Sequence, residues 1–297
     1  MSFHAMNRRS FLQTTTAGAA ATLFAGKLSW AAREHKIDKI GVQLYTVRDL
    51  MKDDFDGTIA KVAQIGYKEV EFAGYFGRTG KQVREVVEKN GLAPVSTHVQ
   101  WDELDDKFPS VIETSKDIGL QYVICPFISE ELRKSPDIWK QASDKFNKCG
   151  EQCNKAGLKF GYHNHWFEFL PVNGKLPYDE LLRDCDPKLV VMEMDLCWIT
   201  AAGGDPIKYF DKYPGRFPLV HVKDIKKMPK ITAGGGQNFG DSLKELTSVG
   251  SGIIDWKKLF SYSDKAGIKH YFVEHDKPEN PIESITASYQ YLEKLRW

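Results

Sequence analysis

Histidine and acidic side chains gather in four short segments of the second half of the chain, each at the end of a hydrophobic run. The segments are His163-Asn164-His165, Glu193-Met194-Asp195, His221-Val222-Lys223-Asp224 and Glu274-His275-Asp276. Imidazole nitrogens and carboxylate oxygens suit one divalent ion such as Mn, Co, Zn or Mg. A single polar residue at a strand end is as often a structural hydrogen-bonding group. Four such ends in succession predict a metal site.

The elements that must bring these segments together are short β-branched runs, which alternate with amphipathic helical patterns from residue 37 onward. The expected strands are Ile40–Thr46, Glu69–Ala73, Ala93–Val99, Tyr122–Pro126, Lys159–His165, Val190–Leu196, Pro218–Lys223 and His270–His275. Strands separated by helices pair in parallel, and eight such units close a barrel. A doubly wound open sheet usually has a glycine-rich turn after its first strand, where this chain has Val47-Arg48-Asp49. The sequence therefore predicts an α/β protein with a single (β/α)8 TIM-barrel domain, residues 37–297.

Capping residues and glycines mark the expected helix boundaries. Helices over Thr58–Gln64, Lys81–Lys89 and Trp256–Ala266 are expected to start after the caps Asp56, Thr79 and Asp255. A glycine that follows a helix readily takes the left-handed backbone conformation that ends it. The glycines in such positions are Gly66, Gly91, Gly119, Gly157 and Gly267.

The strand ends of a TIM barrel share one face, and the active sites of these barrels lie there. Two glycine-containing loops are expected on this face, one at 233–240 and one at Gly250-Ser251-Gly252. Neither has the strand-loop-helix register of a phosphate-binding loop. Because alternate residues of a strand face the same side, His163 and His165 are expected to point inward together.

Two further polar residues end earlier strands, Glu71 the second and His98 the third. Each either lines the same pocket and binds substrate or makes a structural hydrogen bond. The remaining histidines, His4, His35 and His270, have no such position and are interpreted as incidental.

Composition narrows the class of protein. The chain has 297 residues and a formal net charge of +1, which gives no sign of a basic face for nucleic acid. Nothing after the first thirty residues is apolar for long enough to span a bilayer. The five cysteines are an odd number without metal-site spacing, and we interpret most of them as small buried hydrophobic residues.

The N-terminus has the features of an export signal. Arg8 and Arg9 precede Phe11 and Leu12, a weakly apolar stretch follows, and Ser29-Trp30-Ala31 offers a small-x-small cleavage site. Residues 1–32 therefore predict a twin-arginine signal, which exports folded proteins to the periplasm or beyond. Without the signal, no stable membrane association is expected. The alternative is a poorly ordered N-terminal arm.

The chain as a whole resembles the sugar phosphate isomerase/epimerase family, with the xylose isomerase-like TIM barrel of the AP endonuclease family 2 superfamily. The resemblance covers nearly the whole chain after the N-terminal segment. The segments that carry it are Ile40-Gly41-Val42-Gln43-Leu44-Tyr45-Thr46-Val47-Arg48-Asp49, Tyr162-His163-Asn164-His165, His221-Val222-Lys223-Asp224, Gly250-x-Gly-Ile-Ile-Asp-Trp256 and Phe272-Val273-Glu274-His275-Asp276.

The resemblance implies a metal ion held by a Glu after strand five, an Asp after six, a His after seven and a Glu after eight. Asp195, His221 and Glu274 match the last three positions. Where many relatives have Glu-Asn-His, this chain has His163-Asn164-His165. Either His163 takes the ligand position or Glu168 reaches back to the ion. The family's Asp-x-x-His after strand six is here Asp195-x-x-Trp198.

These ligands predict proton-transfer chemistry on a small sugar. A divalent ion at a carbonyl oxygen and its neighbouring hydroxyl favours loss of the C–H proton between them and stabilises the enediolate that forms. We expect Glu274 or Glu168 to be the base, with His163 and His165 as ligand or proton shuttle. Lys223 either offsets the oxyanion charge or pairs with Asp224 as a structural residue. The indole of Trp198 is expected to stack on a sugar face.

Four functions remain open at this point. The first is isomerisation or epimerisation of a ketose, inosose or related sugar, without a clustered Arg/Lys set for phosphate. The second is elimination or hydration on 3-keto-glycosides, which His163 in place of a glutamate and the export signal both favour. An AP endonuclease is disfavoured by Trp198, which stands where those enzymes have a further histidine ligand. A non-catalytic sugar-binding protein is disfavoured by the retained Asp195 and Glu274. Barrels of this kind often pair through their helices, so a homo-oligomer also stays open.

Overall fold

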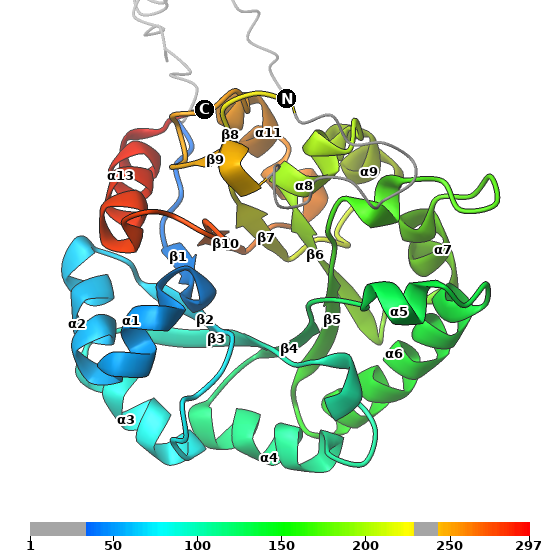
Figure 1. Cartoon of the computed structure of the whole chain (residues 1–297), viewed down its shortest axis with the longest axis horizontal. Helices are drawn as coiled ribbons and strands as arrows, with labels where there is room; N and C mark the ends of the chain where they lie inside the picture. Colours follow the sequence, from blue (N-terminus) through cyan, green and yellow to red (C-terminus); the bar gives the residue numbers. More distant parts are fainter. Residues whose placement is uncertain (1–33, 229–242) are drawn as a thin grey trace, which may run out of the picture. The chain divides into compact units, whose positions relative to one another are not determined.

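The computed structural model describes residues 34–228 and 243–297, and residues 35–297 form one compact unit. The predicted closed barrel is confirmed, because parallel strands pair side by side in the order β1-β10-β7-β6-β5-β4-β3-β2. Figure 1 shows these strands at the centre, surrounded by helices. The barrel strands are β1 (Ile40–Gln43), β2 (Glu69–Phe72), β3 (Ala93–His98), β4 (Tyr122–Cys125), β5 (Lys159–His163), β6 (Val190–Asp195), β7 (Leu219–Val222) and β10 (His270–Val273). Each lies inside one of the expected ranges.

Helices follow the strands along the chain and cover the barrel. The helices are α1 (Arg48–Asp53), α2 (Phe55–Ile65), α3 (Gly80–Lys89), α4 (Phe108–Ile118), α5 (Glu130–Arg133), α6 (Ile138–Lys155), α7 (Pro177–Asp184), α8 (Leu196–Ala201), α9 (Pro206–Lys212), α11 (Trp256–Phe260), α12 (Ser263–Ala266) and α13 (Pro281–Lys294). Shorter elements are the 3-10 turns η1 (Leu44–Val47), η2 (Trp101–Glu103) and η3 (Phe167–Phe169), and an antiparallel pair, β8 (Asp224–Ile225) with β9 (Leu246–Thr247).

Of the expected helix starts, Thr79 and Asp255 are confirmed as caps of α3 and α11. Asp56 is wrong as a cap, because the Asp54 carboxylate accepts the hydrogen bond from the Gly57 backbone N–H at 2.9 Å and α2 already begins at Phe55. A capping side chain must stand before the first helical residue, and Asp56 lies inside the first turn.

The single helix expected over Trp256–Ala266 is also wrong, because α11 ends at Phe260 and α12 begins at Ser263. The Tyr262 N–H bonds to the Leu259 carbonyl three residues back, a tighter turn that interrupts the helix. The expected glycine ends are confirmed, since each of them has a positive φ: Gly66, Gly91, Gly119, Gly157 and Gly267.

Alternation along the strands separates the barrel interior from the surrounding helices. On β7, Val220 and Val222 belong to the large apolar cluster that packs against the helices, whereas Leu219 belongs to a small separate cluster with Phe272 of β10. His221, two residues after Leu219, therefore points inward as well. Inside the barrel an apolar layer thus lies beneath the polar residues at the strand ends.

The first residues of β2 and β10, the two strands that flank β1, form a second polar layer at the opposite end of the barrel. The His270 Nδ1 lies 2.8 Å from the Glu69 carboxylate, and both residues are buried. His270 stands at the start of β10, away from the strand ends, which agrees with the expectation that it is incidental to the site.

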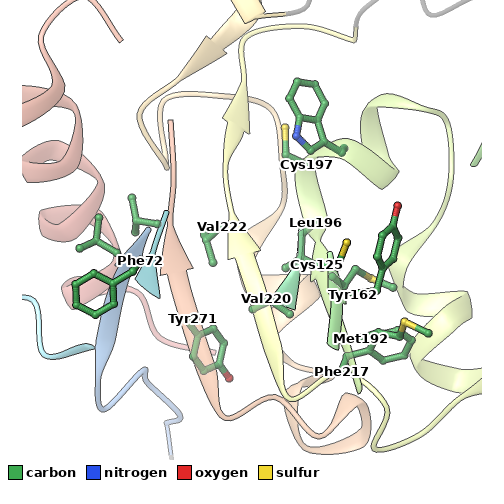
Figure 2. Packing of buried hydrophobic residues seen from close by; sticks show 14 of the residues in the cluster. Phe72, Cys125, Tyr162, Met192, Leu196, Cys197, Phe217, Val220, Val222 and Tyr271 are labelled. Atoms are coloured by element: carbon green, nitrogen blue, oxygen red, sulfur yellow. The ribbon is translucent and has the colours of Figure 1, made fainter. Parts of the chain in front are cut away.

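The large outer cluster fills the space between strands and helices. Figure 2 shows part of it, including Tyr162, Met192, Phe217, Val220 and Val222. The expectation for the cysteines is confirmed, since all are free and buried: Cys125, Cys149, Cys153, Cys185 and Cys197.

Asp224 fixes the loop that carries the second glycine motif. Its buried carboxylate accepts hydrogen bonds from the backbone N–H of Gly250 (2.9 Å), Gly252 (3.2 Å) and Ile254 (3.3 Å), and from the indole N–H of Trp256 (3.0 Å). A Cβ on residue 252 would lie 2.0 Å from this carboxylate, so the position requires glycine. Trp256 is therefore part of the core, not of a sugar-binding surface.

Two predicted segments lie outside the described residues, the export signal over 1–32 and the glycine-rich loop over 233–240. Both stay predictions. No helix within the described ranges combines the length and the apolar character that a membrane crossing requires.

Candidate metal and catalytic site

Three imidazoles surround one carboxylate oxygen at the ends of β3, β5, β6 and β7. The Glu193 Oε2 lies 2.9 Å from the His98 Nε2, 3.1 Å from the His163 Nδ1 and 3.3 Å from the His221 Nε2. Register explains part of this grouping, because His163 and Glu193 are partners across the β5–β6 pair. Glu193, His163 and His221 are buried, and His98 is the most accessible of the four. We call these four residues the lower ligand set.

A second group lies beside it and shares His221. The His221 Nδ1 is 2.7 Å from the Glu274 Oε2, and the register across β6 and β7 places Asp195 next to His221. Asp195, His221 and Glu274 also offer ligand atoms close enough for one ion. We call these three residues the upper ligand set. It contains the Asp, His and Glu that the family resemblance implied.

The chemistry of these residues fits a divalent metal ion. The Oε1 atoms of Glu71 and Glu193 are buried and have no hydrogen-bond partner among residues 34–228 and 243–297. A buried carboxylate oxygen left without a hydrogen bond is costly unless a cation or a water satisfies it. Nitrogen and oxygen donors within 4.8 Å of one another can supply that cation's ligands.

A buried ammonium lies against the upper ligand set. The Lys223 Nζ is 2.8 Å from the Glu274 Oε2 and 3.1 Å from carboxylate oxygens of Asp195 and Asp276. Burial by itself lowers the pKa of Lys223, but the three carboxylates raise it by more than burial lowers it. The pKa of Lys223 therefore lies well above its ordinary value. Burial likewise raises the pKa of Glu274, whereas Lys223 and His221 lower it to a net value below normal. Lys223 is therefore a permanent cation and Glu274 a weak base.

A cavity of about 270 Å³ opens above these groups. It is lined by Tyr45, Ala73, His98, Gln100, Pro126, Phe127, His163, His165, Lys223, Glu274 and Asp276. The expectation that His163 and His165 face the same side is confirmed, since both line it. Three histidines stand on one side of the lining, from β3 and β5, and Lys223, Glu274 and Asp276 stand on the side of β7 and β10.

His165 is a neutral imidazole at the cavity wall. Its ring stacks between Phe167, at 5.6 Å, and Trp198, at 6.4 Å between ring centroids. Burial lowers the pKa of His165 well below 6.5, and the Lys223 ammonium lowers it further. Its Nδ1 is buried and has no hydrogen-bond partner within the described part of the chain. A neutral imidazole of this kind can accept a proton at neutral pH.

Glu168 lies behind the cavity wall, outside both ligand sets and outside the lining. Its buried carboxylate accepts hydrogen bonds from the Tyr162 hydroxyl at 2.5 Å and from the His165 backbone N–H at 2.9 Å. Burial raises the pKa of Glu168 to about 7, although these hydrogen bonds oppose the shift. Glu168 therefore holds the backbone of His165, and the structure does not bring it to the ion.

We expect the substitution Glu168→Gln to change how stability depends on pH. A carboxyl group whose pKa is raised in the folded state stabilises the fold at low pH. This stabilisation is lost as the pH rises from the pKa of the unfolded chain to the pKa of the folded protein. A shift from 4.5 to about 7 corresponds to roughly 3 kcal/mol. The free energy of unfolding of the glutamine variant, relative to that of wild type, should therefore increase by about 3 kcal/mol from about pH 4 to about pH 8, as measured by urea denaturation. The exposed Glu113→Gln should show no such gain, and equal curves for both variants would refute the assignment.

The remaining predicted site residues take different positions. His98 joins both the lower ligand set and the lining, whereas Glu71 is fully buried beneath, with its Oε2 2.6 Å from the His221 Nε2. Trp198 is fully buried behind His165 and does not line the cavity. The proposed pairing of Lys223 with Asp224 is wrong, because consecutive strand residues face opposite sides and Asp224 binds the glycine loop instead.

Sequence reasoning assigned no role to Gln43, and it gave none to Glu193 or Asp276 beyond placing them in the strand-end segments. Glu193 stands two residues before Asp195, so alternation alone placed both on the inner side of β6. Gln43 donates a hydrogen bond to the Glu71 Oε2 at 2.8 Å and so positions that carboxylate. Asp276 follows β10 in a loop, where no periodicity indicates that its carboxylate turns back to Lys223.

Comparison with known proteins agrees with the barrel fold. Residues 59–295 match the family described as xylose isomerase-like TIM barrel. Inosose dehydratase from Geobacillus thermodenitrificans is 22% identical over 80% of this chain and 88% of its own length. A sugar phosphate isomerase/epimerase from Parabacteroides distasonis has a crystal structure that is 25% identical, covers 86% of this chain and 98% of its own, and superposes with a TM-score of 0.70. The crystal structure of the IOLI protein with a bound zinc atom is 18% identical, covers 85% and 95% of the two chains, and has a TM-score of 0.65. The match over most of its length shows that this chain belongs to the xylose isomerase-like TIM barrel family.

Proposed function

We propose that this protein is a metal-dependent enzyme that removes a proton next to the carbonyl group of a polyhydroxy ketone and then expels the β-oxygen substituent. The observation that carries the proposal is one cavity shared by a neutral imidazole, His165, and a permanent ammonium, Lys223, above buried metal-type ligands. A base and an electrophilic group on opposite sides of a small polar cavity are what enolisation requires.

The chain's own residues have distinct parts in this reaction. His165 accepts the proton from the carbon next to the carbonyl, because its imidazole is neutral and lines the cavity. Lys223 lies where its charge stabilises the developing enolate oxygen, held there by Asp195, Glu274 and Asp276. A bound divalent ion would polarise the carbonyl oxygen. The imidazolium returns the proton to the departing oxygen, so that water or an alcohol leaves and the base is regenerated.

Two observations support elimination over epimerisation. The carboxylates in the cavity, Glu274 and Asp276, lie on the side of β10, while the facing wall offers histidines from β3 and β5. A carboxylate base for each face of the sugar is therefore missing among the described lining residues. The relatives include inosose dehydratases from Geobacillus thermodenitrificans and Clostridium tetani, which supports a dehydration of this type.

Isomerisation or epimerisation of a free ketose is the second candidate, because the same enolisation starts it and the similar crystal structure from Parabacteroides distasonis carries that name. A phosphorylated substrate is not supported by the cavity. Among the described residues that line it, Lys223 is the one lysine or arginine, and three carboxylates already surround it. The export signal over 1–32 adds the further proposal that the enzyme acts outside the cytoplasm.

Proton NMR in deuterated water distinguishes these outcomes. The full chain, loaded with Zn²⁺ or Mn²⁺, is incubated with an inosose, a free ketose or a 3-keto-glucoside. We expect loss of the signal of the proton next to the carbonyl, together with release of the β-substituent and an unsaturated ketone that absorbs in the ultraviolet. Deuterium incorporation without release would instead establish isomerisation or epimerisation. If none of the three compounds exchanges a proton, the enolisation chemistry is wrong.

A further inference from the structure

We infer that the metal ion is held by the lower ligand set, His98, His163, Glu193 and His221, and not by the Asp195, His221 and Glu274 of the upper set. This inference rests on the metal dependence of the proposed function. Of the ligands implied by the family resemblance, it keeps His221 and replaces Asp195 and Glu274 with His98 and Glu193. The ion then lies deeper in the barrel, and the carboxylates of the upper set serve the ammonium of Lys223.

The first support is convergence of the donor atoms. A single Glu193 oxygen has the His98 Nε2, the His163 Nδ1 and the His221 Nε2 within 3.3 Å. The three imidazole rings are packed at centroid separations of 5.2 Å, 5.4 Å and 4.3 Å. A point facing all three nitrogens and a carboxylate has the three-nitrogen, one-oxygen composition of a metal site.

The second support is the orientation of the shared histidine. The His221 Nδ1 lies 2.7 Å from the Glu274 Oε2, and its Nε2 faces the other way, 2.6 Å from the Glu71 Oε2 and 3.3 Å from the Glu193 Oε2 of the lower set. Metal-ligating histidines almost always donate their other ring N–H to a carboxylate or carbonyl, which fixes the ring. In this arrangement Glu274 orients a ligand, and it need not be a ligand itself.

The third support is Lys223, which already satisfies the upper set. Its Nζ lies 3.1 Å from the Asp195 Oδ2 and 2.8 Å from the Glu274 Oε2, and the side chain is 1% exposed. A divalent ion between the same two carboxylates would stand beside a buried ammonium, and like charges at that distance repel strongly. The lower set has no lysine or arginine in ion-pair contact among the residues described.

The fourth support is the unused oxygen atoms beside the three imidazoles. The Oε1 of Glu193 is fully buried without a hydrogen bond in the described ranges, and so is the Oε1 of Glu71, whose other oxygen contacts His98 and His221. Three imidazoles with one carboxylate favour Zn or Co, and disfavour Mg, which prefers oxygen ligands in an octahedron.

The inference is tested by metal binding, without any activity assay. Purified full-length chain is stripped with a chelator and titrated with Co²⁺ under visible absorption, as wild type, Glu193→Gln and Asp195→Asn. We expect Glu193→Gln to weaken Co²⁺ binding at least about 100-fold, because it removes a direct ligand. Removal of a residue that only orients a ligand already lowers metal affinity by about 10- to 100-fold. Asp195→Asn is the matched control, because its amide oxygen still caps α8, and it should weaken Co²⁺ binding less than Glu193→Gln does.

X-ray absorption on the zinc-loaded wild type keeps the test decisive if Glu193→Gln does not fold. Three imidazoles around zinc support the lower set, whereas one or two overturn it. Loss of Co²⁺ binding in Asp195→Asn with retention in Glu193→Gln would also overturn it, and would leave the proposed metal dependence intact. A wild-type chain that binds neither metal would refute both the inference and the proposed function.

Discussion

We expect Lys223→Met to lower the free energy of unfolding by about 3–5 kcal/mol, because removing one partner of a buried ion cluster leaves the others uncompensated. The ammonium has 1% of its surface exposed and contacts Asp195, Glu274 and Asp276 within 3.1 Å. Methionine fills the same volume but leaves three buried carboxylates facing one another. Urea denaturation of the chelator-treated protein at neutral pH measures the difference.

A surface lysine provides the matched control. Lys265 pairs with Asp211, but both side chains are about half exposed, so Lys265→Met should cost less than about 1 kcal/mol. Adding Asp276→Asn to Lys223→Met should restore part of the lost stability, since it removes one of the unpaired charges. If the free energy of unfolding of Lys223→Met is within about 1 kcal/mol of the wild-type value, the repulsion among the three carboxylates is compensated without the ammonium. Lys223 would then have no structural role.

The sequence predicted the barrel well because its strands are short, strongly β-branched and separated by capped helices. All of the expected strands occur, and the boundary errors are local. Asp54 caps the helix that Asp56 was expected to cap, two residues earlier in the chain, and a tight turn at Tyr262 interrupts the helix after Asp255. Such details depend on single hydrogen bonds, which leave no periodic pattern in the sequence.

The candidate site was predictable in part. His163, His221 and Glu274 stand at strand ends, so the fold alone brings them to one face. Glu193 lies in one of the strand-end segments, but no role was predicted for it, because its closeness to His98 depends on a contact across the barrel between residues 95 positions apart in sequence.

Glu168 shows the opposite failure. Its acidic character and its position after β5 suggested a ligand or base, yet its carboxylate folds back onto Tyr162 and the His165 backbone. Side-chain direction in a short 3-10 turn such as η3 is set by tertiary packing, and spacing along the chain does not indicate it.

We expect His165→Phe to lower the rate of proton exchange on the substrate by about 10²- to 10⁴-fold, the range typical of a removed general base. Phenylalanine keeps the ring between Phe167 and Trp198 and removes both nitrogens, so folding and metal content should be unchanged. The measurement is the rate of deuterium incorporation, or of product release, at saturating ketone. His35→Phe is the matched control, because His35 is exposed and outside the cavity lining.

The pH profile separates a proton-transferring role of His165 from a merely structural one. The base must be neutral, and its pKa is lowered below 6.5 by burial and by Lys223, so the acid limb of kcat/KM should lie below the usual histidine range. In Lys223→Met that limb should move toward higher pH, because the opposing positive charge is gone. His165→Phe should lose the limb entirely while retaining bound metal. A variant that keeps both its rate and its acid limb would assign proton abstraction to another group, and Asp276 would then be the cavity residue to replace next, since burial raises its pKa to about 6.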